Sequence, residues 1–227
     1  MIKTLEDIVS TSRGRGKKRL IVAYAEDSHT IEAVNGAVGM GLVDAVLVGE
    51  PDEIKKVCDM SGVDHSGFEI VAETGDVASV ARAVKMVSSG EGDVLMKRLV
   101  STDKYMHGIL NKEYSLVPPQ GVLRHVVVTQ LPCYHKLLIV SDVAIIPYPD
   151  LRQQTAKIGY LIDPAHALGI ECPIVACIAP TEQVLPAPPS SVEGAVLAMF
   201  HYRGQLKCAM SAGPLSFYSP PLTAIPE

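Results

Sequence analysis

The sequence has no tryptophan, few aromatic residues (5%) and no cysteine pair with the Cys-x-x-Cys spacing of common zinc sites. Its five cysteines are an odd number, so we expect reduced thiols and a cytoplasmic protein, without a disulfide framework. The most apolar stretch, 126–146, contains Pro132, His135, Lys136 and Asp142, and no membrane span is expected there. Early acidic residues at the N-terminus argue against a secretory signal. The formal net charge of −5 argues against nucleic acid as a partner.

What remains is the composition of a globular protein, with 48% hydrophobic and 20% charged residues. A length of 227 residues allows one large domain or two small ones, at roughly 150 residues per domain.

Short apolar runs alternate with helix signals along most of the chain. Residues 20–24 form a continuous apolar run, as in a strand buried on both faces, and Asp27 follows as a helix N-cap. The pattern predicts an α/β protein built from βαβ units, with mostly parallel strands. The predicted strands are 20–24, 44–48, 68–71, 93–96, 124–129, 137–140, 173–179 and 206–210, and the predicted helices begin near residues 28, 51, 76, 101, 149 and 190.

Proline and glycine mark the expected domain limits. The segment 118–121, Pro-Pro-Gln-Gly, divides an N-terminal domain, 1–119, from a second α/β domain, 120–211. Four prolines in 212–227 predict an irregular tail, because proline has no backbone N–H to donate.

One candidate anion site lies where the strand 93–96 is followed by Lys97 and a helix that begins at Ser101 or Thr102. Free N–H groups and the helix dipole favour an anion at a helix N-terminus, and Lys97 adds a full charge. His107 lies four residues after Asp103, on the same helix face. The alternative is an ordinary helix cap beside solvated cations.

Other strand ends also carry polar groups. His135 and Lys136 precede one strand and are candidates for a phosphate contact, and Asp142 follows that strand as a candidate hydrogen-bond acceptor. Gly213 would allow a ligand to approach the backbone closely. The alternatives are a surface histidine, a turn or cap aspartate, and a plain turn glycine.

Familiar catalytic motifs are absent from the sequence: it has no Walker A, H-E-x-x-H or G-x-S-x-G segment, and we expect no metal site. The residues alone therefore predict an α/β protein with an anion site.

Several segments resemble, in the same order, the phosphate acetyl/butyryltransferase family. The resemblance covers roughly residues 17 to 217. The segments are 17–23 with 25–27, 95–97 with 101–102, 109–113, 134–142 with 149–151, 175–176 with 182–184, 203–206 and 213–215.

The resemblance implies two α/β domains with an interdomain cleft, a homodimer, and acyl transfer between coenzyme A and inorganic phosphate. Coenzyme A would be a substrate, and no covalently bound cofactor is expected. Thr102 falls where the family has hydroxyls near the phosphate, and Lys97 lies beside it. Phosphate or coenzyme A would be bound by the candidates Lys97, Ser101, Thr102, His107, His135, Lys136 and Gly213; Lys97 and Asp142 are the catalytic candidates.

The chain also departs from the family pattern. The family has glycine at Arg98, arginine at His107, serine at Arg124 and aspartate at Ala212. Family members continue into a G-N-x-x-Y-K-like segment and an S-R-containing segment, which residues 219–227 do not resemble. Alternative hypotheses are therefore a catalytically impaired protein that binds coenzyme A or phosphate, a phosphate acyltransferase dependent on acyl carrier protein, and a structural subunit.

Overall fold

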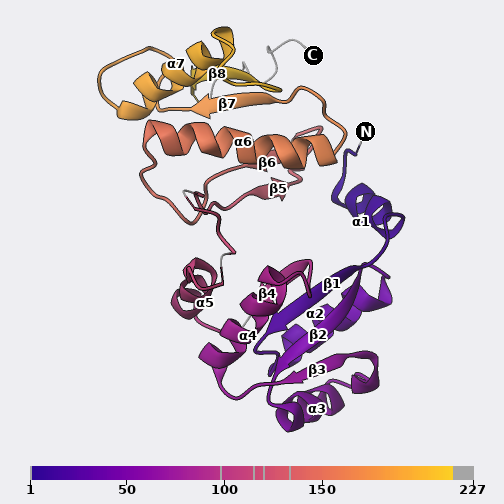
Figure 1. Cartoon of the computed structure of the whole chain (residues 1–227). Coiled ribbons are helices and arrows are strands. Elements are labelled where there is room, and N and C mark those ends of the chain that lie inside the picture. Colours follow the sequence, from indigo (N-terminus) through magenta and orange to yellow (C-terminus); the bar gives the residue numbers. More distant parts are fainter. Residues whose placement is uncertain (1, 98, 115, 120, 133, 217–227) are drawn as a thin grey trace. The chain divides into compact units, whose positions relative to one another are not determined.

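The computed structural model describes residues 2–97, 99–114, 116–119, 121–132 and 134–216 (Figure 1). The chain forms two compact units, one of residues 9–121 and one of residues 1–8 together with 122–227. The sequence predicts a division at 119/120, which would place residues 1–8 in the N-terminal domain; in the structure they belong with residues 122–227.

The first unit is built around a four-stranded parallel sheet in the order β3-β2-β1-β4. Helices connect the strands, as the alternating pattern predicts. Helix α1 (Leu5–Arg13), which the sequence analysis did not predict, begins in residues assigned to the second unit and ends in the first. The other elements of the first unit are β1 (Lys18–Ala23), α2 (Ser28–Gly39), β2 (Val43–Gly49), α3 (Pro51–Met60), a 3₁₀ turn η1 (His65–Gly67), β3 (Glu69–Ala72), α4 (Asp76–Ser88), β4 (Val94–Lys97) and α5 (Thr102–Leu110).

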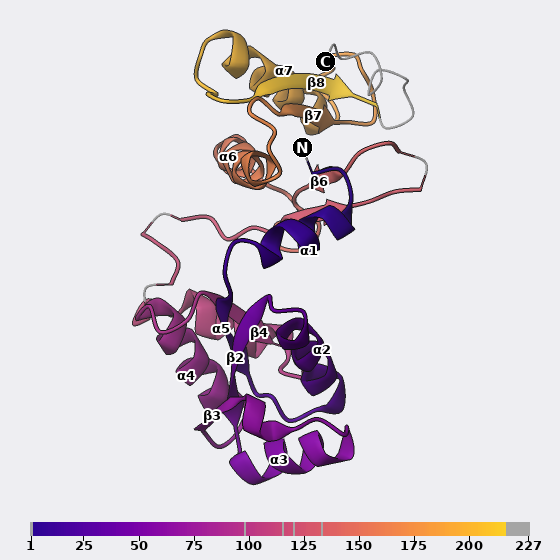
Figure 2. The same cartoon turned by 90° about the vertical axis from the view of Figure 1, so that its right-hand side faces the viewer.

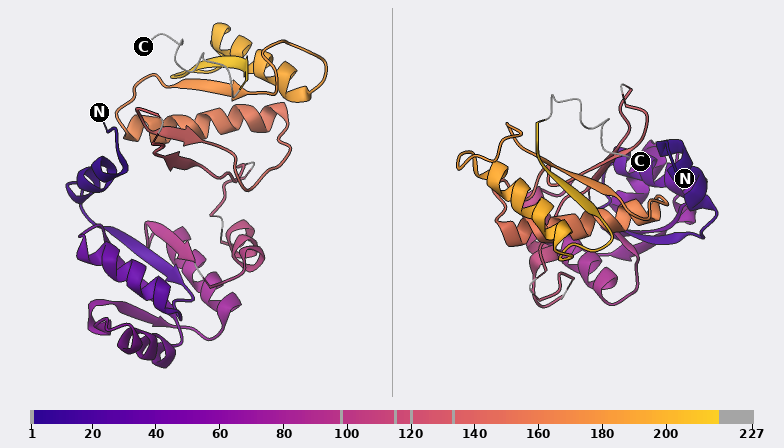
Figure 3. Two further views of the ribbon diagram at one scale, coloured as in Figure 1. Left: turned by 180° about the vertical axis from the view of Figure 1, so that it is seen from behind. Right: turned by 90° about the horizontal axis from the view of Figure 1, so that it is seen from above.

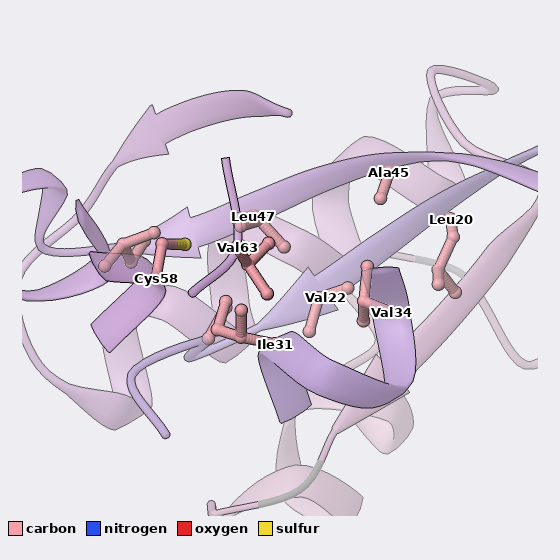
Figure 4. Close-up of a cluster of buried hydrophobic side chains, with 10 residues drawn as sticks. Leu20, Val22, Ile31, Val34, Ala45, Leu47, Cys58 and Val63 are labelled. Atoms are coloured by element: carbon pink, nitrogen blue, oxygen red, sulfur yellow. The ribbon is translucent and has the colours of Figure 1, made fainter. Parts of the chain in front are cut away.

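The central strand β1 contributes to two cores, because successive side chains point to opposite faces of a sheet. Leu20 and Val22 pack in the cluster on the α2 and α3 side, with Ile31 (Figure 4). Ile21 and Ala23 pack in the cluster on the α4 side. Figure 2 shows these helices on opposite sides of the strands. The sheet is thus covered on both faces, which explains its continuous apolar runs.

The second unit contains two small sheets. Strands β5 and β6 form an antiparallel pair, whereas β7 and β8 are parallel. Helix α6 lies between the two pairs in Figures 1 and 3, and the core joins α6 and α7 through Ile158 and Leu197. The elements are β5 (Val127–Thr129), β6 (Leu138–Val140), α6 (Leu151–Ala167), β7 (Ile174–Ile178), α7 (Pro189–Tyr202) and β8 (Met210–Leu215).

Local sequence signals set the helix starts. The Asp27 carboxylate accepts a hydrogen bond from the N–H of Thr30 at 3.0 Å, which caps α2. Asp150 and Gln153 form a reciprocal capping box at the start of α6, with bonds of 2.7 and 3.0 Å. The predicted α/β class with parallel strands is confirmed.

The last strand corrects two predictions. A strand was expected at 206–210 and an irregular tail from 212, but β8 spans Met210–Leu215. Pro214 is compatible with it because, among the described residues, β8 pairs with β7 alone, and this pairing is irregular between Ala176 and Ile178, opposite the proline. Proline is tolerated in edge strands and bulges. The rest of the predicted tail, 217–227, lies outside the described residues.

Candidate functional site

The first unit has a topological switch point between β1 and β4. From β1 the sheet continues through β2 and β3 on one side and β4 on the other. Ligands of open α/β sheets bind outside the carboxyl ends of the strands at such points. Lys97, the last residue of β4, lies opposite Ala23, the last residue of β1, so it stands at this edge.

The Lys97 side chain folds over the start of α5. Its ammonium donates hydrogen bonds to the carbonyl oxygen of Val100 at 3.0 Å and to the Thr102 hydroxyl oxygen at 3.2 Å. It also lies 5.8 Å from the ring centroid of Tyr105, within cation–π range. The structure thus brings Lys97 and Thr102 into direct contact at the positive end of a helix. Arg98 lies outside the described residues.

Ser101 is the N-cap of α5. Its hydroxyl oxygen accepts a hydrogen bond from the N–H of Lys104 at 3.3 Å. This contact is the ordinary cap considered above, so Ser101 shapes the helix start. Thr102, at the first helical position, is exposed and carries the hydroxyl nearest to Lys97.

His107 lies in the last turn of α5, and its side chain is exposed. It lines an open groove of about 400 Å³ together with Asp103 and Lys104 of the same helix and Val80 of α4. The Lys104 ammonium pairs with the Asp76 carboxylate, and this hydrogen bond lowers the pKa of Asp76. His107 is therefore displaced along the helix from the Lys97–Thr102 contact.

Two residues of this unit were missed by the sequence analysis. Gly108 allows α5 to approach α4 closely, because a Cβ there would lie 2.5 Å from the Val80 side chain. Tyr24, directly after β1, has a positive φ of 58°, which is an outlier for an aromatic residue. Burial raises the pKa of the Tyr24 phenol, and the neighbouring Glu26 carboxylate raises it further. A glycine within a predicted helix can indicate close packing against a second helix, so Gly108 carried a sequence signal. No sequence signal predicts the positive φ of Tyr24.

The remaining candidates lie in the second unit. Asp142 follows β6, and its side chain is only 3% exposed. It accepts hydrogen bonds from the N–H groups of Ala144, Ile145 and Ile146, at 3.0, 2.9 and 3.2 Å, and from the Arg124 guanidinium at 3.4 Å. Burial alone would raise the pKa of Asp142, but these donors together hold it below its ordinary value. An ionised carboxylate with four donors is an anchor for its loop and a poor proton acceptor at neutral pH.

Arg124 faces Asp142 with a side chain that is 1% exposed. The charges of this pair act on Lys157 of α6, and Lys157 in turn acts on Cys177 of β7. Burial, and then the positive charge of Arg124, lower the pKa of Lys157. Burial raises the pKa of Cys177, whose sulfur lies 3.5 Å from the Ser211 hydroxyl. Lys157 and Cys177 were also missed, although a lysine next to a core isoleucine in a helix was an available signal.

His135 and Lys136 lie in the loop before β6, and both are exposed. The His135 ring centroid is 4.9 Å from that of Tyr134. Gly213 lies in β8 and not in the turn considered above: a Cβ there would lie 2.6 Å from the Cβ of Cys177. Close packing of β8 on β7 therefore accounts for this glycine.

The candidates thus form two groups. Lys97, Ser101, Thr102 and His107 belong to the first unit, and Asp142, His135, Lys136 and Gly213 belong to the second. No cluster of three or more histidine, cysteine, aspartate or glutamate side chains suited to a metal occurs among the described residues. Over that same part of the chain, no helix is long and apolar enough to cross a membrane.

Comparison with known proteins points to one family. Residues 3–79 match the family described as phosphate acetyl/butaryl transferase. The chain is 37% identical to the phosphate butyryltransferase of Clostridium acetobutylicum over 95% of its own length and 71% of the relative's. It is 34% identical to the phosphate acetyltransferase of Thermotoga maritima, over 93% of this chain and 71% of that protein.

Solved structures share the fold at lower identity. A branched-chain phosphotransacylase from Enterococcus faecalis superimposes with a TM-score of 0.73 at 19% identity, covering 88% of this chain and 68% of that one. A phosphotransacetylase from Streptococcus pyogenes gives 0.72 at 14% identity, covering 98% and 77%. With the sequence matches along nearly its whole length, the chain belongs to the phosphate acetyl/butyryltransferase family.

Proposed function

We propose that this chain transfers an acyl group between coenzyme A and inorganic phosphate, so that acyl-CoA and phosphate give an acyl phosphate and free coenzyme A. One observation carries the assignment within the family. A lysine ammonium and a threonine hydroxyl, 3.2 Å apart, meet at a helix N-terminus on the switch-point edge of a parallel sheet.

These groups suit a phosphate ion. An ammonium has three N–H donors, and Lys97 directs two of them at Val100 and Thr102. Among the described residues no acceptor takes the third N–H, so it is available to an oxygen of the ligand. The first-turn N–H groups of α5 add the positive end of the helix dipole. A phosphate held there is positioned with one oxygen as the nucleophile.

The reaction develops charge that the same groups stabilise. When a phosphate oxygen attacks the thioester carbonyl carbon, negative charge grows on the carbonyl oxygen until the carbon–sulfur bond breaks and coenzyme A leaves as a thiolate. Hydrogen-bond donors that are already in place lower the activation barrier of this step, and one such donor typically raises the rate by about 10²–10³-fold. We assign this electrostatic role to Lys97 and the role of phosphate contact to Thr102. Asp142, with its four donors, is assigned a structural role.

The test is phosphate-dependent release of thiol from butyryl-CoA by the full chain, with the acyl phosphate trapped as a hydroxamate. The variant Lys97→Met should lower kcat/KM by about 100-fold, because it removes a charge that acts in the transition state. The matched control is Lys55→Met, at an exposed lysine of α3, which should leave the rate unchanged. Equal rates in both variants would remove Lys97 from the site.

The outcome of the same assay separates the alternative hypotheses. Coenzyme A binding without thiol release by a folded chain would support an impaired binding protein. Release only from an acyl carrier protein thioester would support the carrier-dependent reaction. We further propose a cytoplasmic homodimer, on the family resemblance. Sedimentation of the purified chain as a monomer at assay concentration would refute the dimer.

A further inference from the structure

The Arg124 guanidinium in the second unit has more donors than partners. Its side chain is 1% exposed, and its Nη1 donates to Asp142 Oδ2 at 3.4 Å. Its Nε and Nη2 are buried without a hydrogen-bond partner among the described residues. A buried cation with unpaired N–H groups is costly, so such groups call for an acceptor.

The two unpaired nitrogens are not an arbitrary pair. Nε and Nη2 form one straight edge of the planar guanidinium, and their N–H bonds point in parallel. This edge matches two oxygens of a carboxylate or phosphate in a bidentate contact. Asp142 takes only the opposite end and leaves this edge intact.

Other groups around Arg124 fit an anion. The hydroxyl of Ser141, next to Asp142 in the chain, is also buried without a partner among the described residues. Lys157 of α6 is close enough for the Arg124 charge to lower its pKa, after the effect of burial. Cys177, Asp142 and Glu193 raise the pKa of Lys157. Glu193 already accepts a hydrogen bond from Gln154 at 2.6 Å. An oxyanion beside Arg124 would relieve the repulsion between the two cations.

We propose that the Nε–Nη2 edge of Arg124 binds a small free oxyanion, inorganic phosphate. The choice of phosphate among oxyanions rests on the proposed function, in which phosphate is a substrate; the bidentate edge itself does not. A small ion is favoured over a phosphate group of coenzyme A because the donor atoms are buried.

Calorimetric titration of the full chain with inorganic phosphate, in a phosphate-free buffer, tests the site. The comparison uses a Lys97→Met background, in which the α5 N-terminus lacks the Lys97 charge. There, Arg124→Lys keeps a cation facing Asp142 but removes the bidentate edge. Phosphate affinity should fall about tenfold or more, as expected for two charge-assisted hydrogen bonds. The matched control is Arg203→Lys, at an exposed arginine after α7, which should not change the affinity.

A second variant guards against misfolding. Arg124→Ser with Asp142→Ser removes both charges, so neither is left buried alone, and the folded double variant should show the same loss of phosphate binding. Unchanged phosphate affinity in Arg124→Lys, or no binding in the Lys97→Met parent, would overturn the proposal.

Two further arms identify the source of the phosphate and separate this site from the proposed activity. A loss of coenzyme A affinity in Arg124→Lys, with inorganic phosphate bound as before, would also overturn the proposal. If the chain binds phosphate through Arg124 but releases no thiol from butyryl-CoA, the proposed function fails and the site stands. If Lys97→Met slows thiol release but Arg124→Lys leaves the phosphate affinity unchanged, the proposed function stands and the Arg124 site is refuted.

Discussion

The buried pair of Arg124 and Asp142 predicts an asymmetry between its two members. In Asp142→Asn, Arg124 loses its charged partner, while its Nε and Nη2 already have no hydrogen-bond partner among the residues that the structure describes. Removing one member of a buried ion pair costs about 3–5 kcal/mol, because the other charge stays buried. In Arg124→Met, Asp142 keeps three backbone N–H donors. The loss should then be near that of one charged hydrogen bond, about 1.5–3 kcal/mol.

Urea unfolding in a phosphate-free buffer measures both costs, and thermal unfolding gives a second reading. At about 2–4 °C per kcal/mol for a chain of this length, Asp142→Asn should lower Tm by about 6–20 °C. The control is Asp44→Asn, in the exposed pair of Asp44 with Lys17, which should cost at most about 1 kcal/mol. Equal costs for Asp142→Asn and Arg124→Met, or a larger cost for the arginine variant, would refute the reasoning.

The same pair fixes a pH dependence. Because the folded-state pKa of Asp142 is lowered, its contribution to stability is present above the unfolded-state pKa of about 3.9 and is lost as pH falls through the folded-state value. The difference in unfolding free energy between the wild type and Asp142→Asn should therefore shrink in acid. A difference that stays constant below pH 4 would contradict the assignment of an ionised Asp142.

Three further predictions concern packing, capping and reactivity. Gly108→Ala forces a Cβ to within 2.5 Å of Val80 and should destabilise the first unit by about 1–3 kcal/mol in urea unfolding, with the second change Val80→Ala restoring stability. Ser101→Ala removes the N-cap of α5 and should cost about 1 kcal/mol, seen as faster amide exchange at the start of that helix; unchanged exchange would show that the cap contributes nothing. Cys177, with its raised pKa and half-buried thiol, should react with a disulfide reagent far more slowly than the exposed Cys208. Equal rates would mean that burial does not protect it.

The sequence predicted the fold of the first unit well, because its strands are buried on both faces and stand out as apolar runs. Short strands with one neighbour carry a weaker signal. The missing N–H of proline argued against a strand at 212–215, yet the irregular pairing of β8 with β7 accommodates Pro214. The antiparallel pairing of β5 with β6 likewise involves only three residue pairs, and no local sequence pattern specifies it.

The candidate site was predictable in part. A strand followed by Lys97 and a helix-capping hydroxyl identified the end of β4 and the start of α5. The contact of Lys97 with Thr102 depends on a rotamer, so the sequence indicated proximity but not the bond. The pair of Arg124 with Asp142 joins two loops 18 residues apart, and nothing local in either loop specifies it. The burial of Arg124 and Asp142 depends on how the second unit packs, which the sequence alone does not show.

The two-faced packing of β1 has a consequence for cooperativity. Each of the two clusters, one on each side of the sheet, includes alternate residues of β1. A cavity opened by Ile31→Ala on one side therefore weakens the strand that also organises the other side. The two helical layers should lose their protection together, as one foldon, although the two clusters have no residue in common.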